Sequence, residues 1–97
     1  MKTAQEVFSM VTKNKQNIIN RYISDIEVIV LEEAVLGRTR IDVDMYFHNM
    51  TQAEAENLCS DVINVLKSYG YVAYRKSSLV EHSYDFYATQ IHISWSA

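Results

Sequence analysis

The chain has 97 residues, of which 48% are hydrophobic and 22% charged, with two glycines and no proline. A chain of this length forms one domain, residues 1–97, and its composition is typical of a packed globular protein. The net charge of −3 gives no general attraction to nucleic-acid phosphates. No stretch approaches the about 20 apolar residues of a membrane span, so we predict no membrane partner. The single cysteine, Cys59, cannot form an internal disulfide, so we expect a reducing compartment, the cytoplasm.

The N-terminal region predicts one long helix. Thr3, with a glutamate three residues later, forms a capping-box pattern, and apolar residues then recur with helical spacing. Because Gly37 can end a helix in the left-handed conformation, the simplest interpretation is a helix over residues 4–36. In a second interpretation, which remains open, the helix ends near Ser24, the β-branched residues 26–31 form a strand, and the glycine lies at a hairpin tip.

The rest of the chain predicts a strand, a helix and two further strands. Apolar and polar residues alternate in the strands, and a second capping box at Thr51 opens a helix that ends at Gly70. Strands are predicted at residues 38–48, 71–76 and 87–95, with a polar turn at 77–84. The order is α-β-α-β-β. We therefore predict an α+β fold in which a three-stranded antiparallel sheet has both helices on one face and its polar face exposed.

The predicted first helix is longer than the sheet. A helix of about 33 residues runs roughly 50 Å, whereas a nine-residue strand covers roughly 30 Å. The N-terminal half of the helix would then present an apolar stripe to water, and such a stripe usually pairs with a partner. We predict a homo-oligomer whose interface contains Val7, Phe8, Val11 and Ile18.

No motif in the sequence carries recognisable catalytic chemistry. No nucleophile is paired with a base, and no glycine-rich loop could hold a phosphate. Cys59 lies on the apolar stripe of the second helix, where we expect a buried, inert thiol. The polar sheet face carries Asp42, Asp44, His48 and His92, but this alternation is ordinary for a half-exposed sheet. We therefore predict no metal site, no cofactor and no enzymatic activity.

Aromatic and basic residues are concentrated in the last third of the chain. They flank the loop at residues 76–85, and their mixture suits a protein partner as well as a base and a phosphate. In an alternative interpretation the alternate tyrosines belong to the core, because strands favour tyrosine. We predict that the contact surface consists of Tyr71, Tyr74, Arg75, Lys76, Tyr84 and Tyr87.

Three short sequence segments lie at the ends of the predicted helices and of the last predicted strand. They are Leu-Glu-Glu-Ala-Val-Leu-Gly at 31–37, Val-Leu-Lys-Ser-Tyr-Gly-Tyr at 65–71 and Ile-His-Ile-Ser-Trp at 91–95. This layout resembles that of small phage accessory proteins, although residues 26–31 are more apolar here and the last polar loop is longer. The resemblance implies an accessory protein in the cytoplasm of an infected bacterium, which blocks a host or defence protein or sequesters a small signalling molecule.

The resulting hypothesis is a small non-catalytic binding protein, an inhibitor or a sequestering protein, whose partner is a host protein or a small signalling molecule. A first alternative is a single-stranded nucleic-acid-binding module, with Tyr46 and Tyr71 stacking on bases and Arg40 and Arg75 on phosphates. The two aspartates of the polar sheet face disfavour nucleic acid. A second alternative is a structural or assembly protein that acts through the first helix.

Overall fold

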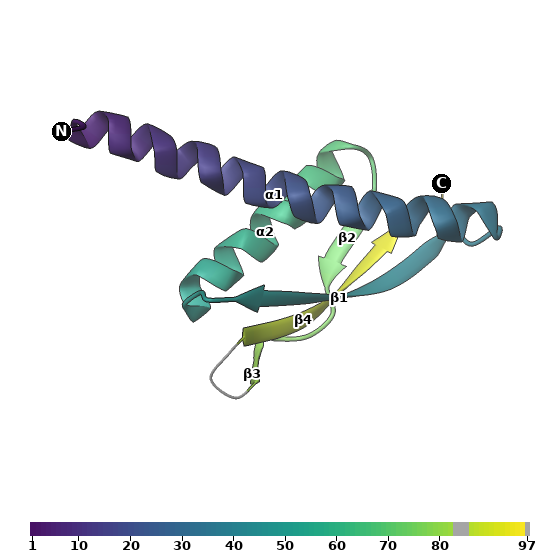
Figure 1. Ribbon diagram of the computed structural model, residues 1–97. Coiled ribbons are helices and arrows are strands. Elements are labelled where there is room, and N and C mark those ends of the chain that lie inside the picture. Colours follow the sequence, from purple (N-terminus) through teal and green to yellow (C-terminus); the bar gives the residue numbers. More distant parts are fainter. Residues whose placement is uncertain (83–85, 97) are drawn as a thin grey trace.

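The computed structural model describes residues 1–82 and 86–96, and it confirms the predicted α+β fold (Figure 1). The elements are α1 (Ala4–Val35), β1 (Arg40–His48), α2 (Gln52–Ser68), β2 (Val72–Arg75), β3 (Val80–His82) and β4 (Phe86–Ser94). Compared with the predicted order, the structure adds only the three-residue strand β3.

The N-terminal region is one continuous helix. α1 runs through Ser24 and residues 26–31 without interruption, so the interpretation with a strand in this region is wrong. Ile26 and Val30 are four residues apart, lie on the same side of the helix and are buried in the core. Burying two β-branched side chains outweighs their small helix-propensity cost, which is why a strand-like composition does not produce a strand here.

Glycine ends both helices. Gly70 follows α2 with a φ of +94°, and the backbone N–H of Tyr71 donates to the Leu66 carbonyl at 3.2 Å to close the last turn. Gly37 ends α1 in the same way, with a φ of +82°. Both glycines therefore occupy the left-handed positions that the sequence predicted.

Replacing Gly70 by alanine is expected to lower the free energy of unfolding by about 1–2 kcal/mol, because alanine is strained in the left-handed region. No atom lies within 4 Å of an added Cβ at this position, so the loss is conformational rather than steric. Urea denaturation followed by circular dichroism measures it. Gly70→Asn is the matched control and should lose less, since asparagine tolerates this region better. An alanine variant as stable as the wild type would contradict this account.

The sheet is three strands wide because β2 and β3 share one edge of β4. β1 pairs antiparallel with β4 along its whole length and occupies the other edge. β2 pairs with residues 91–94 of β4 and β3 with residues 86–88, so these two strands lie end to end. β3 falls inside the region predicted as a polar turn, residues 77–84. A three-residue strand is too short to show the alternation that identifies a strand in a sequence.

Both helices lie on one face of the sheet (Figure 1). This helix-covered face buries the side chains that the alternation had assigned to it, among them Phe47 of β1 and Ile91 and Ile93 of β4. No described helix or strand packs on the opposite face, which we call the open face. By strand parity and register the open face consists of Arg40, Asp42, Asp44, Tyr46, His48, Val72, Tyr74, Val80, Phe86, Ala88, Gln90, His92 and Ser94.

The first half of α1 extends beyond the sheet. Every residue from 1 to 18 is exposed, and the first buried residue of the helix is Ile19. We call residues 1–18 the overhang, and Figure 1 shows it projecting from the rest of the molecule. With the overhang included, the longest axis of the protein measures 54 Å. Neither α1 nor any other helix in the described ranges is long and apolar enough to cross a membrane.

Candidate partner-binding face

The six predicted contact residues are divided between the two faces of the sheet. Tyr71 and Tyr87 are half-buried on the helix-covered face and pack against the core. Arg75 lies opposite the buried Ile91, so it belongs to the same face, where its side chain is exposed. For the two tyrosines the structure agrees with the alternative interpretation, in which alternate tyrosines belong to the core.

Tyr74 and Lys76 lie on the open side. The Tyr74 ring stacks on the His92 ring with centroids 5.0 Å apart and an interplanar angle of 30°. His92 Nδ1 lies 2.8 Å from Asp42 Oδ1, and Lys76 Nζ donates to Asp42 Oδ2 at 2.9 Å. These four side chains form one connected polar row across β1, β4 and β2. The sixth predicted residue, Tyr84, lies outside the described residues.

The hydrogen bond from Lys76, and then that from His92, lowers the pKa of the Asp42 carboxyl below its ordinary range. Because the folded-state pKa is lowered, the stabilisation from Asp42 is present above about pH 4 and is lost as the pH falls through the lowered pKa. An NMR titration of the Asp42 side chain should show a low midpoint that rises in Lys76→Ala. Lys67→Ala, which removes a lysine from α2, is the control and should leave the midpoint unchanged. An unchanged midpoint in Lys76→Ala would rule out this ion pair.

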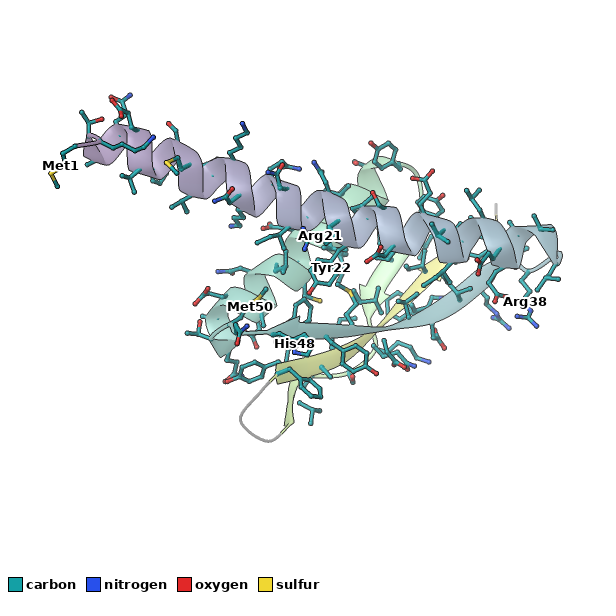
Figure 2. All side chains as sticks on the ribbon, viewed as in Figure 1. Met1, Arg21, Tyr22, Arg38, His48 and Met50 are labelled. Atoms are coloured by element: carbon teal, nitrogen blue, oxygen red, sulfur yellow. The ribbon has the colours of Figure 1, made fainter. Side chains whose placement is uncertain are left out.

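An aromatic cluster lies further along the open face. The Tyr46 and Phe86 rings meet edge to face with centroids 5.6 Å apart, and His48 lies 5.1 Å from the same phenylalanine. Tyr22 reaches from α1 toward β1 and donates its hydroxyl to the Tyr46 carbonyl at 2.7 Å (Figure 2). Burial, followed by the charge of Asp25, raises the pKa of Tyr22 above its ordinary value, so the hydroxyl remains a donor to a higher pH than that of an exposed tyrosine. The backbone beneath the exposed Tyr46 ring is therefore held from the helix side.

A shallow hollow of about 500 Å³ lies beside this cluster, next to the segment that connects the end of β2 to the start of β3. Asp44 and Tyr46 form one wall, and Phe86 and Gln90 of β4 line the hollow as well. The chain stays attached to β4 through the break, because the backbone N–H of Lys76 donates to the Gln90 carbonyl at 2.8 Å. The hollow is therefore a gap between side chains on the open face, and the backbone beneath it remains hydrogen-bonded to β4.

Asp44 brings to this hollow a carboxylate that no cation of the described residues balances. Within the described chain it accepts one hydrogen bond, from Gln90 Nε2 at 3.3 Å, and takes part in no ion pair. Asp42, by contrast, is paired with Lys76 and His92. A carboxylate beside an exposed tyrosine ring is the environment that a guanidinium or ammonium group prefers.

Cys59 is covered by the core. Its side chain is 1% exposed, and burial raises the pKa of the thiol, while the nearby charge of Arg75 acts in the opposite direction. A covered, protonated thiol is a poor nucleophile, since the thiolate is the reactive form. In residues 1–82 and 86–96, no three side chains of the types that bind metals gather at one place.

The nucleic-acid hypothesis needs two tyrosines and two arginines on one surface. Tyr46 and Arg40 lie on the open face, whereas Tyr71 and Arg75 lie on the helix-covered side. A single strand on the open face would therefore meet one tyrosine and one arginine of the four.

Sequence reasoning did not identify the aromatic cluster around Phe86. The predicted last strand began at residue 87, which left Phe86 unassigned between this strand and the turn at 77–84, and Val80 was assigned to that turn. One signal was present: Phe86 lies six positions before His92, and an even difference in position places both residues on the polar face of one strand. The pairing of Phe86 with His48 across the sheet was not visible in the sequence.

Comparison with known proteins identifies no family for this chain, because no family model, no curated protein and no solved structure matches it. The chemistry of the open face is therefore what a function can be inferred from.

Proposed function

We propose that the protein is a small non-catalytic binding protein that holds a protein partner on its open face and acts stoichiometrically. The observation that supports this is the unbalanced carboxylate of Asp44 beside the Tyr46 ring, which is 48% exposed. An arginine or lysine of the partner would pair with the carboxylate and lie against the ring. Tyrosine and arginine are the residues that most often dominate the binding energy of protein interfaces.

The shape of the open face favours a protein over a small signalling molecule. Small-molecule sites enclose most of the ligand surface, whereas the hollow beside Asp44 is shallow. The neighbouring row of Tyr74, His92, Asp42 and Lys76 already has its charges paired. A row of this kind suits the polar rim of an interface, around a hot spot at the hollow.

The resemblance to small phage accessory proteins suggests the class of partner. An accessory protein of that kind would occupy the surface of a host or defence protein in the infected bacterium and block it. Inhibition would then require one copy of this chain for each occupied site, and no substrate would be turned over.

Affinity capture from a lysate of the host cell, with matched baits, tests the proposal. Asp44→Asn removes the charge and keeps the shape, and Glu32→Gln makes the same change at an exposed position of α1. The wild type and Glu32→Gln should retain a protein that Asp44→Asn loses, and native mass spectrometry of the complex should give a fixed ratio of whole numbers. If Asp44→Asn and the wild type retain the same proteins, the open face is not the contact surface.

A peptide probe tests the recognition chemistry directly. In an NMR titration, a short arginine-containing peptide should shift the signals of Asp44, Tyr46 and Gln90 more than the same peptide with citrulline, the uncharged isostere of arginine. Equal shifts from the two peptides, or shifts spread over the whole molecule, would contradict a cation site at the hollow.

A further inference from the structure

A second candidate surface lies between α1 and the start of α2, next to the end of β1, and its proposed role does not depend on that of the open face. A groove of about 510 Å³ separates the overhang from the start of α2. Val11 and Ile18 of α1 form one wall, and Met50 and Leu58 provide apolar surface on the other. Figure 2 shows Met50 below the N-terminal half of α1, across this groove.

The apolar side of the overhang is the side that lines the groove. At about 100° per residue, Val7, Val11 and Ile18 lie within about 40° of one another around the helix, and Phe8 lies at the edge of the same stripe. Ser9 lies almost opposite. Val11 and Ile18 line the groove, whereas Phe8, which is 70% exposed, lies at the edge of the stripe and borders a second hollow with Ser9 and Thr12.

The helical conformation of the overhang has little support from the rest of the chain. The ion pair between Lys15 Nζ and Asp61 Oδ2, at 3.4 Å, ties its last turn to α2, while the Thr12 hydroxyl only donates back to the Phe8 carbonyl at 3.1 Å. Serine, threonine, asparagine and valine are frequent here, and all have lower helix propensity than alanine. Helices of about 12–15 residues are marginal alone in water. A partner that packs against the apolar stripe would stabilise the helical conformation of the overhang.

We propose that two copies of this chain associate through antiparallel α1 helices, with a two-fold axis at Val11, so that the overhang of each copy lies in the groove of the other. In this arrangement Val7 of one copy lies within one residue of the level of Asn14 of the second copy, which lines the groove. The exposed Val7 side chain then faces the apolar wall formed by Met50 and Leu58. The apolar stripe is exposed and the groove is empty in a single chain, and in the dimer the stripe of each copy fills the groove of the other.

The contact area requires the groove as well as the stripe. The helical part of the overhang is about 22 Å long and 10 Å wide, so its lateral surface is about 700 Å², of which a partner covers about half. Two stripes alone would bury about 700 Å² in total, in the range of adventitious contacts. The facing walls of α2 must therefore contribute about 300 Å² for the total to reach about 1,000 Å², the lower limit for a specific interface. The dimer is therefore expected to be weak and concentration-dependent.

Charge favours a second copy as the occupant of the groove. The overhang contains three lysines and one glutamate, a net charge of +2. Because the whole chain carries −3, residues 19–97 carry −5. The overhang of one copy is thus attracted to the body of another, and this attraction should weaken as salt is added.

Sedimentation velocity over a range of about 1 µM to 1 mM tests the association. The wild type should shift from the 11.2 kDa monomer to twice that mass. Val11→Lys should remain a monomer, whereas Ser9→Lys, with the same charge on the opposite side of the helix, should dimerise like the wild type. Both positions are exposed, so circular dichroism should show both variants folded. A wild type that stays monomeric throughout, or equal behaviour of the two variants, would overturn the proposal.

Cysteine cross-linking tests the orientation. In a Val7→Cys, Asn14→Cys double variant, oxidation should give a covalent dimer, since each new thiol lies next to the other kind in the second copy. The two positions lie about 10 Å apart along one helix, too far for a bridge within the chain. Native Cys59 is buried and should not interfere. Cross-linking of Val7→Cys alone would indicate parallel helices and overturn the antiparallel geometry.

Discussion

Replacing Phe47 by alanine is expected to lower the free energy of unfolding by about 3–5 kcal/mol, the largest stability loss that we predict for this chain. Phe47 is completely buried, and its ring lies 5.7 Å from that of Tyr22, which joins β1 to α1. A domain of this size has a total stability of about 5–15 kcal/mol. The variant should therefore unfold at much lower urea concentration, as followed by circular dichroism.

The neighbouring residue provides the matched control. Tyr46 points to the open face, so Tyr46→Ala should change the free energy of unfolding by less than about 1 kcal/mol. The same variant should lose affinity for the proposed protein partner, because its ring forms one wall of the hollow. Equal stability losses in Phe47→Ala and Tyr46→Ala would contradict the assignment of these residues to opposite faces.

Asp44→Asn is expected to weaken binding of the proposed protein partner about 10- to 100-fold, the range for losing a charge-assisted hydrogen bond. The reason is that the carboxylate has no cation within the described chain and would find one in the partner. Isothermal titration calorimetry with the captured partner measures the change. The affinity of the wild type should also fall with added salt more steeply than that of the variant.

Asp42→Asn is the control for this prediction. The Asp42 carboxylate is already paired with Lys76 and His92, so it would pair less strongly with a cation of the partner. The Asp42→Asn variant should therefore lose less affinity for the partner than Asp44→Asn. If the two variants lose the same affinity, or neither loses any, the unbalanced charge of Asp44 is not what the partner recognises.

The ends of the helices could be predicted because their signals are local. Thr3 and Thr51 each accept a hydrogen bond from the backbone three residues later, and Gly37 and Gly70 close the two helices. Each of these contacts joins residues within one turn. The period-two alternation of residues 38–48 likewise separated the buried side of β1 from its polar side before any partner strand was known.

The candidate site could be predicted only in part. The sequence drew attention to Tyr74 and Lys76, but it grouped them with Tyr71 and Tyr87, which pack against the core. The face on which each residue of β2 lies depends on its register with β4, and that register depends on pairing between distant segments. The hollow beside Asp44 exists because the edge of the sheet is interrupted between β2 and β3, and no local sequence pattern predicted this interruption.

The sequence by itself determined the helix ends, the alternation of the long strands and the class of fold, because capping, glycine conformation and amphipathic spacing act over a few residues. Only the tertiary structure decided that residues 26–31 are helical, since burial in the core outweighs a small difference in propensity. It also decided which polar groups meet. Asp42 receives Lys76 from 34 residues away and His92 from 50 residues away, because strand pairing brings these segments together.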